Sequence, residues 1–478
     1  MRDGNTKRKK PHYIRENYTS ALPQRMLFLD TETKLAGAPE NGLNVFRLGS
    51  ACYVVNESRD FKALREKWFF LYKVSEVYDM IESLCFDDSV LHVYGSNISF
   101  DISASQLITF LSRRGWELVA YREKHLTFIL IVKHGKKKIK FMALQNFMPT
   151  SIKALGDLLG IPKLEVEYDT KDVAKLMNYC ARDVVILKEG VLAWYRFVLD
   201  NDLGGHALTL PSQGLRAFRH KFMSVKLLVH NEPELSEYER LAYHGGRCEA
   251  FRIGKAPANE YVLVDVNSMY PFVMQRYEYP TARLGFIERG NVDNLIMRLK
   301  RYCVIALVYI ETTEPVFLCS HEKRTCYPVG KFWTLLNTRS LLYALKHNMI
   351  RQVWSGVYYK KKKVFPAYVQ YFYELRQRFT TEKNEIYREI AKKYMNTLYG
   401  KFAQKVDIEI ENDYESDDRI SVEEWYDATT GARGSEITML HRTIMTEGEE
   451  EGKDSIVSIA SHITDDARLM LWQYMRRC

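Results

Sequence analysis

Disulfide-forming cysteine pairs and long apolar runs are both scarce in this sequence. It has eight cysteines in 478 residues, scattered and without a CxxC pair, which excludes a disulfide scaffold and favours a reduced, intracellular protein. No apolar run reaches the roughly 18 residues of a membrane span, so no membrane partner is expected. The basic N-terminus lacks the apolar core of a signal peptide, and residues 1–25 are predicted to form a disordered arm.

Two common catalytic motifs are missing as well. His321-Glu322 is not followed by a second histidine, because Thr325 stands where HExxH requires one, and a zinc protease is excluded. No GxxxxGK[ST] sequence occurs, so a nucleotide-hydrolysing motor has no support. Cys319, His321 and Cys326 do not have the spacing of a standard zinc module, and packing or an exposed loop is the preferred interpretation.

What the sequence does have is a mild basic excess and many tyrosines. Lys and Arg number 69 against 60 Asp and Glu, which gives a formal charge of +9. This excess suits a polyanionic partner without establishing one. The 31 tyrosines suit the stacking of nucleic-acid bases as well as ordinary packing.

Hydrophobic periodicity divides the chain into an α/β part and a mixed part. Strands alternate with helices over the first 200 residues, which indicates an α/β domain. Further along, VLVD (262–265) is predicted to be a buried strand of a new sheet, and residues 365–402 have a helical pattern.

Five residues of the first part could form one hydrolytic site. Asp30 and Glu32 alternate on a predicted strand, so their side chains share a face. Asp101 follows another strand, and Tyr179 and Asp183 lie one helical turn apart. Taken singly, each acid is more typical of a surface charge. Together, four acids could bind two hard cations about 4 Å apart, and the tyrosine could orient an attacking water.

The order Asp-x-Glu, Asn-x-x-Phe-Asp and Tyr-x-x-x-Asp resembles the three motifs of the DEDDy 3′–5′ proofreading exonucleases, which have an RNase H-like fold. The resemblance implies that Asp30, Glu32, Asp101 and Asp183 are catalytic metal ligands and that Tyr179 is catalytic. The residues that it assigns to single-stranded DNA are Thr33, Asn97, Phe100, Ser151 and Ile152.

A second set of residues follows the predicted strand. Asp265-x-x-Ser268-Met-Tyr270-Pro resembles motif A of the family B DNA polymerases. The resemblance implies that Asp265 is a catalytic metal ligand and that Ser268 and Tyr270 bind the incoming nucleotide. Taken alone, the segment is more simply interpreted as a strand that ends in a turn with proline.

A helix further along supplies a matching motif. Lys392-x3-Asn396-Thr397-x-Tyr399-Gly400 resembles motif B of the same family, with threonine in place of the usual serine. The resemblance assigns Lys392 and Tyr399 to the nucleotide. It assigns Asn396, Thr397 and Gly400 to the DNA.

A third motif and the lengths of two segments indicate a branch of the family. Tyr243-x-Gly245-Gly246 resembles the Tyr-x-Gly-Gly motif that contacts template DNA between the two active sites. Only 29 residues precede Asp30, and residues 282–364 lie where the protein-primed, phi29-like branch of organelles, viruses and linear plasmids inserts its first terminal-protein region.

The family's motif C, Tyr-x-Asp-Thr-Asp, is not found after Gly400, and neither is a thumb. The adjacent pairs Asp417-Asp418 and Asp465-Asp466 lack the setting of that motif. Three explanations compete: the N-terminal part of a longer polymerase, which is preferred, a split enzyme whose second chain carries motif C and thumb, and a nuclease with a reduced palm.

These inferences predict an α/β RNase H-like exonuclease domain followed by a truncated right-hand α+β palm with fingers. The expected function is DNA-directed DNA synthesis with 3′–5′ proofreading inside the host cell of a virus or plasmid. The alternatives are a stand-alone exonuclease and a DNA-binding subunit.

The resemblance implies two Mg2+ or Mn2+ ions per active site, with primer–template DNA, single-stranded DNA, dNTPs, a terminal priming protein and a second chain as partners. The predicted domains are the arm (1–25), the exonuclease domain (26–200), the start of the palm (201–281), the terminal-protein-region insertion (282–364), the fingers helices (365–405) and a palm continuation ending before motif C (406–478).

Overall fold

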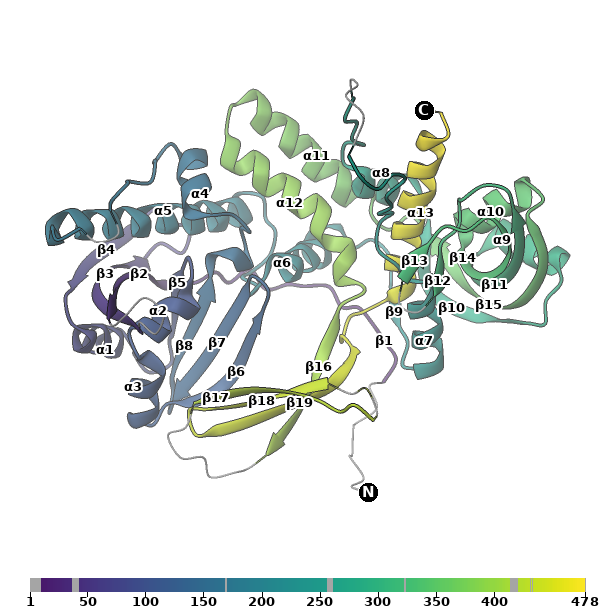
Figure 1. The fold of residues 1–478 in the computed structure, drawn as a ribbon. Helices are drawn as coiled ribbons and strands as arrows, with labels where there is room; N and C mark the ends of the chain where they lie inside the picture. The colour runs from purple at the N-terminus through teal and green to yellow at the C-terminus, as the bar shows by residue number, and fades with distance from the viewer. Residues whose placement is uncertain are drawn as a thin grey trace.

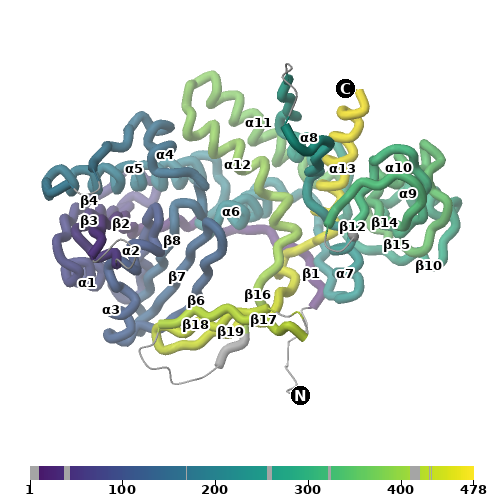
Figure 2. Tube along the Cα trace, viewed as in Figure 1, coloured from purple at the N-terminus to yellow at the C-terminus, as the bar shows by residue number. Residues whose placement is uncertain are grey.

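The structure is a computed structural model that describes residues 10–36, 43–167, 170–255, 261–321, 324–412, 420–429, 431 and 433–477. The molecule consists of an N-terminal α/β domain, a central group of helices, a smaller α/β unit and a long antiparallel sheet (Figure 1; Figure 2). The central helices come from segments before and after the smaller unit, and one of them follows the long sheet. Among the described residues, none of the helices has the length and apolar character needed to span a bilayer.

The N-terminal domain is built on a mixed seven-stranded sheet. Its strand order is β4-β3-β2-β5-β8-β7-β6, with β2, β5 and β8 parallel and the other pairs antiparallel. The run Met26–Leu29 at the centre of the sheet is fully buried, as expected for a strand covered on both faces. The strands are β2 (Arg25–Ala36), β3 (Leu43–Asn56), β4 (Leu64–Leu71), β5 (Val90–Gly95), β6 (Glu117–Lys124), β7 (Thr127–His134) and β8 (Lys137–Ala143).

Helices cover both faces of this sheet (Figure 1). The long α5 (Val173–Asp200) and α4 (Ile152–Leu159) pack on the face that carries Met26 and Phe28. The opposite face, with Leu27 and Leu29, packs against three shorter helices. These are α1 (Val74–Ser83), α2 (Ile98–Ala104) and α3 (Leu107–Arg113), and the 3-10 turn η1 (Leu144–Asn146) follows β8.

The central helices share a core with α5. Tyr394 of α12 stacks on Trp194 of α5 and on Phe372 of α11, with ring centroids 5.4 and 4.7 Å apart. Continuous aromatic packing therefore fixes the helical hairpin α11–α12 to the N-terminal domain. The helices of this region are α6 (Leu210–Ala217), the π-helical turn η2 (Phe218–Phe222), α7 (Pro233–Ala242), α8 (Met269–Arg276), α11 (Pro366–Thr381), α12 (Glu385–Lys401) and α13 (Val457–Met475).

The smaller α/β unit occupies the segment predicted to be an insertion. Its antiparallel sheet has the order β10-β15-β11-β14, and Trp472 of α13 packs on its core. Cys319 and Cys326 face each other across a separate exposed two-stranded ribbon. The elements are β10 (Tyr279–Glu288), α9 (Val292–Arg301), β11 (Cys303–Thr312), β12 (Cys319–His321), β13 (Arg324–Cys326), β14 (Gly330–Asn337), α10 (Thr338–Lys346) and β15 (Ile350–Lys362).

A long antiparallel sheet connects α12 with the N-terminal domain (Figure 1). Its order is β16-β19-β18-β17, and Leu440 at its far end packs into the core on the Leu27 face of the seven-stranded sheet. Arg442 adds a 3.0 Å hydrogen bond to the carbonyl of Leu118. The strands are β16 (Lys405–Asn412), β17 (Ser421–Tyr426), β18 (Arg433–Met439) and β19 (Arg442–Glu451).

The predicted disordered arm is wrong for the residues that the structure describes. β1 (His12–Tyr13) pairs with β9 (Leu228–Val229), and Ile14 is only 4% exposed. One buried isoleucine and a short ladder fix this stretch, and neither stands out in a basic, polar segment. Residues 1–9 lie outside the described residues.

Candidate active sites

Three elements bring the four predicted acids of the N-terminal domain together. Asp30 and Glu32 extend from β2, Asp101 from α2 and Asp183 from α5. The backbone amide and hydroxyl of Thr31 donate hydrogen bonds of 3.0 and 2.7 Å to Oδ1 of Asp101. Because β2 and β5 are parallel neighbours, the helix that follows β5 begins beside the end of β2, which explains this contact.

The acids raise one another's pKa. Burial raises the pKa of Asp30 well above its ordinary value, and the charges of Asp101, Asp183 and Glu32 add to the shift. Burial also raises the pKa of Glu32 and of Asp101 to about 7, although Thr31 hydrogen bonds oppose the shift at Asp101. Such mutual repulsion is relieved by cations.

The donor set fits hard divalent ions. Oδ1 of Asp183 is buried and has no hydrogen-bond partner among the described residues. A buried carboxylate oxygen without a partner is costly, and oxygen-rich clusters are the ligands that Mg2+ and Mn2+ prefer. The four carboxyl groups therefore suit the ions that the sequence predicts.

Lys163 belongs to this site, although no sequence pattern indicates it. Its ammonium donates to Oδ2 of Asp183 and lies 4.6 Å from the ring centroid of Tyr179. Burial alone would lower the pKa of Lys163, but the hydrogen bonds with Asp183 and Tyr179 raise it, so the cation is retained. The lysine follows α4 in a segment without periodicity, 20 residues before its partner.

The residues assigned to single-stranded DNA differ in accessibility. Asn97 is exposed at the N-terminus of α2, and Phe100 is half-buried on the same helix. Ser151 is exposed and caps α4 with its hydroxyl. Thr33 and Ile152 are buried, the latter in the main core. Asn97, Phe100 and Ser151 are thus accessible to a DNA strand, and the DNA contacts of all five stay predictions.

Three polymerase-like motifs meet at one point. The rings of Tyr270 and Tyr399 stack with centroids 4.6 Å apart and an interplanar angle of 14°. A Cβ at Gly246 would lie 2.7 Å from the Tyr270 hydroxyl, so a larger residue at this position would displace the tyrosine side chain. Burial raises the pKa of the adjacent Tyr243, and Tyr270 contributes to the shift. Segments more than 100 residues apart in sequence therefore form one surface.

An arginine of α13 holds the Tyr-x-Gly-Gly segment. Arg468 donates hydrogen bonds of 2.8 and 2.7 Å to the carbonyls of His244 and Gly245. Asp465 pairs with the same guanidinium at 3.1 Å. Burial raises the pKa of the neighbouring Asp466 well above its ordinary value. This aspartate pair lies buried on α13, and its rejection as motif C stays a prediction.

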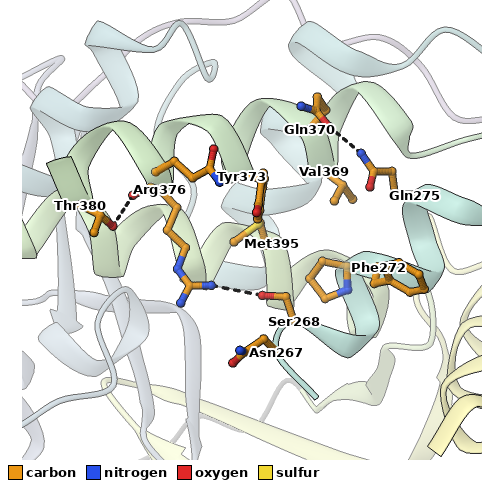
Figure 3. A pocket seen from close by; sticks show the side chains of 12 residues that line it. Asn267, Ser268, Phe272, Gln275, Val369, Gln370, Tyr373, Arg376, Thr380 and Met395 are labelled. Atoms are coloured by element: carbon orange, nitrogen blue, oxygen red, sulfur yellow. Dashed lines mark hydrogen bonds between the residues drawn. The ribbon is translucent and has the colours of Figure 1, made fainter. Parts of the chain in front are cut away.

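A pocket of about 620 Å³ lies between α8, α11 and α12 (Figure 3). Ser268 lines it, and Arg376 of α11 donates a 3.2 Å hydrogen bond to the serine hydroxyl. Gln275 and Gln370 are hydrogen-bonded to each other at another part of the pocket wall. Arg376 is a second functional candidate that the sequence does not indicate, because a lone arginine on a polar helix has no pattern.

On α12, Lys392 and Asn396 are exposed. Lys392 forms an ion pair of 3.6 Å with Glu389, one turn earlier on the helix. The Asn396 amide donates a 3.0 Å hydrogen bond to the carbonyl of Lys392. Both side chains are therefore accessible to a ligand approaching α12.

The remaining residues of this helical motif differ in their contacts. The methyl group of Thr397 lies against α6, where a Cβ at Gly214 would be only 2.8 Å away. A Cβ at Gly400 would meet no atom within 4 Å. The packing of this chain explains Thr397 and not Gly400, where open space is left for a partner.

The predicted strand before Asp265 is wrong. Residues 261–266 form no strand, and Val262, Leu263 and Val264 are 86, 98 and 77% exposed. None of the described strands offers this segment a ladder, and an unpaired strand has no backbone hydrogen bonds to stabilise it. Asp265 is itself exposed.

The described residues do not assemble a two-ion site at Asp265. They contain one group of three potential metal ligands, which is Asp30, Glu32 and Cys180. A single exposed carboxylate does not fit a pair of divalent ions. Among the described residues, the motif residues around Tyr270 and Tyr399 are thus brought together, whereas Asp265 has no second carboxylate in a ligand group beside it.

Comparisons with known proteins agree with this arrangement. The family described as "DNA polymerase type B, organellar and viral" matches residues 161–476. A probable DNA polymerase of Neurospora intermedia is 24% identical over 279 residues, which are 55% of this chain and 28% of that protein. The DNA-directed DNA polymerase of Enterobacteria phage PRD1 is 24% identical over 290 residues, which are 58% of this chain and 47% of that enzyme.

The same family supplies the structural neighbours. The phi29 DNA polymerase complexed with primer–template DNA and incoming nucleotides has a TM-score of 0.65 and 18% identity, covering 95% of this chain and 78% of that one. The phi29 enzyme complexed with single-stranded DNA gives a TM-score of 0.62. This likeness confirms the predicted fold class. From the family match over residues 161–476, the chain belongs to the type B DNA polymerases of organelles and viruses.

Proposed function

We propose that this chain is a DNA-directed DNA polymerase polypeptide with 3′–5′ proofreading, acting inside the host cell in the protein-primed replication of a virus or plasmid genome. The observation that carries the proposal is the meeting of Tyr243, Gly246, Tyr270 and Tyr399 on one surface. Their three motifs are needed together only where a template, a primer end and a nucleotide meet.

In the editing reaction, the chain's own residues position the 3′ end. Two divalent ions held by Asp30, Glu32, Asp101 and Asp183 would polarise the phosphate and supply a nucleophile. Lys163 fixes Asp183 and lies over Tyr179, so it sets the position of both. Asn97 and Phe100 hold the unpaired 3′ nucleotides beside the acids. The phosphodiester bond breaks, and one nucleoside monophosphate leaves per cycle.

In synthesis, the pocket between α8 and α12 receives the dNTP. Arg376, which lines the pocket, and Lys392, an exposed residue of α12 outside its lining, supply positive charge for the triphosphate. Tyr270, which stacks on Tyr399 outside the lining, packs under the sugar. The 3′-hydroxyl of the primer, or a hydroxyl of a priming protein, attacks the α-phosphate. Pyrophosphate is the leaving group.

The exposure of residues 261–265 supports the proposal that this segment pairs with a strand that is not among the described residues. The chain spans 28% and 47% of the length of the Neurospora intermedia and phage PRD1 relatives. We propose that a hairpin carrying the second carboxylate pairs with Val262–Val264, provided by a continuation of this polypeptide or by a second chain with the thumb. Residues 282–364 form a compact sheet with α9 and α10 that we assign to contacts with the priming protein.

A stand-alone 3′–5′ exonuclease is the second candidate function. Its support is the contrast between the four gathered acids and the solitary Asp265. A purely DNA-binding subunit is a weaker alternative, because it gives no reason for acids that destabilise one another when no cation is bound.

A primer assay tests the proposal. A 5′-labelled primer with a mispaired 3′ end is annealed to a template and incubated with the chain and Mg2+, with and without dNTPs. Asp30→Ala removes one carboxylate of the four-acid site, and Asp265→Ala removes the carboxylate of the polymerase-like site. Asp87, which is exposed in a turn, provides the matched control Asp87→Ala.

We expect shortening that Asp30→Ala abolishes and that Asp87→Ala and Asp265→Ala leave intact. Extension should require the longer polypeptide or the second chain, and should then be lost in Asp265→Ala. Shortening without extension under every supplementation would establish the stand-alone nuclease. Neither reaction, with DNA binding indifferent to Mg2+ and to Asp30→Ala, would establish the DNA-binding subunit.

A further inference from the structure

Cys180 places a thiol inside the cluster of acids. It lies on α5 between Tyr179 and Asp183 and is fully buried. Its Sγ is 3.3 Å from Oδ2 of Asp30 and 3.3 Å from the backbone carbonyl of the same residue. The thiol therefore contacts a predicted metal ligand directly.

The sulfur forms a ligand group with two of the acids. One oxygen of Asp30, one oxygen of Glu32 and Sγ of Cys180 all lie within 4.8 Å of one another. Zinc–oxygen and zinc–sulfur bonds are about 2.1 and 2.3 Å, so small side-chain shifts would allow a single ion to contact all three atoms. The three ligands come from β2 and α5, whose packing fixes their spacing.

A further carboxylate of the acid cluster has an oxygen that is buried and unused. Asp183, on the same face of α5 as Cys180, is 5% exposed, and its Oδ1 has no hydrogen-bond partner among the described residues. Lys163 holds only the other oxygen. Asp183 is outside the group whose ligand atoms all lie within 4.8 Å of one another, so it is not a fourth ligand of the same ion. A buried oxygen without a partner nevertheless indicates a cation at the acids independently of the cysteine.

Packing alone explains the thiol less well. Leu48, Leu176 and Met177 form a small apolar cluster with Cys180. A side chain needed only for that cluster would be as well served by alanine or valine, neither of which contacts a carboxylate. The sulfur instead faces Asp30 on the polar side of the cluster.

We propose that Asp30, Glu32 and Cys180 form a binding site for a thiophilic divalent cation, for which Zn2+ and Cd2+ are the probes, at the position that a hard ion would take in the nuclease. Thiolate favours these cations, whereas Mg2+ prefers oxygen. On binding, the S–H bond breaks, a sulfur–metal bond forms and the proton leaves to solvent. The bound ion excludes Mg2+ from the acids and stops nucleolysis.

A cadmium titration of the metal-free full chain tests the site. Thiolate-to-cadmium charge transfer in the ultraviolet reports sulfur ligation, and calorimetry gives the affinity. Cys180→Ser should remove one part of the absorption and weaken binding by roughly tenfold or more. Cys85→Ser, a buried cysteine of the same domain outside the ligand group, is the matched control and should change neither.

Asp30→Asn and Glu32→Gln keep the proposal testable if Cys180→Ser does not fold. Each should remove the same part of the absorption with the thiol still present, because the sulfur alone cannot hold the ion. An unchanged absorption in Cys180→Ser, or one that persists fully in Asp30→Asn, would overturn the site.

Inhibition is a separate readout that rests on the proposed nuclease function. Zn2+ should stop primer shortening at a concentration at least about tenfold lower in the unmodified chain than in Cys180→Ser. Equal inhibition of both would overturn the role of the thiol. If primer shortening is absent altogether but the Cys180-dependent absorption is present, the nuclease proposal fails while the cation site is established.

Discussion

The two acid-bearing regions of this chain differ in how their carboxylates are supported. Asp30 follows the fully buried run Met26–Leu29 of β2, which has neighbouring strands on both sides, and a helix crosses the sheet to bring Asp183 to it. Asp265 lies in an exposed segment that pairs with none of the described strands. A site built within one sheet and its covering helix is complete as soon as that domain folds. A site that depends on one further strand stays open until the strand arrives.

The largest expected effect separates the two regions. Asp30→Ala should lower the rate of 3′ nucleotide removal more than about a hundredfold, since even indirect partners of metal ligands typically contribute roughly 10–100-fold. Asp265→Ala should change that rate less than about twofold, because Asp265 is outside the ligand group at Asp30. Single-turnover degradation of labelled single-stranded DNA measures both. Comparable losses in the two variants would show that the regions act as one site.

Lys163→Ala should be the next largest change. Loss of the cation frees Asp183 and removes the charge above Tyr179, so nuclease activity should fall roughly 10–100-fold. Lys163→Arg keeps the charge and should restore part of the activity. Lys153→Ala, exposed on α4, is the control. A rate for Lys163→Ala equal to that of the control would remove this lysine from the site.

Arg376→Ala tests the pocket next to Asp265 without requiring catalysis. A hydrogen bond to a charged group is worth about 1.5–3 kcal/mol, so the Kd for a dNTP should rise roughly tenfold or more. Arg378→Ala removes a guanidinium from the same helix, where it pairs with Glu382 outside the pocket, and should leave the Kd unchanged. Titration with a fluorescent dNTP gives the values. Equal effects of the two substitutions would place the triphosphate elsewhere.

Glu32→Gln should produce the smallest effect, on stability. Burial and the charge of Asp183 raise the pKa of Glu32 from 4.5 to about 7 in the folded chain. Between these pH values the folded chain binds a proton that the unfolded chain has released, so this group destabilises the fold progressively as pH rises from about 4.5 to about 7. In EDTA, Glu32→Gln should therefore have a Tm that exceeds that of the unmodified chain by roughly 1–3 °C at pH 8.

The same comparison at pH 4 is the control, because there Glu32 is mostly neutral in both the folded and the unfolded chain and the difference should largely vanish. Thermal denaturation followed by circular dichroism measures it. A Tm difference that is the same at both pH values would show that the glutamate is not under electrostatic strain.

The sequence predicted those parts of the sites that depend on local spacing. Alternation on a strand correctly placed Asp30 and Glu32 together, and helical spacing placed Tyr179 beside Asp183. Lys163 and Arg376 could not be predicted in this way. Lys163 reaches its partner from a segment without periodicity, and Arg376 is a lone arginine on a helix whose partner, Ser268, is 108 residues away. The prediction of a strand at Val262–Val264 was wrong for a different reason. Apolar residues indicate that a strand is possible, whereas its formation depends on a partner elsewhere.

The prediction for the N-terminal arm failed in the opposite direction, because a segment expected to be disordered contains a paired strand. Its composition is polar and basic, yet Ile14 and two ladder residues are enough to fix it to β9. The Tyr270–Tyr399 stack was not predicted, since no local pattern relates positions so far apart, and the resemblance implied only that both tyrosines bind the nucleotide.

Hydrogen–deuterium exchange tests most directly the claim that one site is complete and the other awaits a strand. The amides of Leu27–Glu32 should exchange slowly, because β3 pairs with all of that part of β2 and β5 with its beginning. The amides of Val262–Val266 should exchange at nearly the rate of an unfolded peptide, and become protected only when the longer polypeptide or the second chain is present. Strong protection of Val262–Val266 in this chain alone would contradict the account.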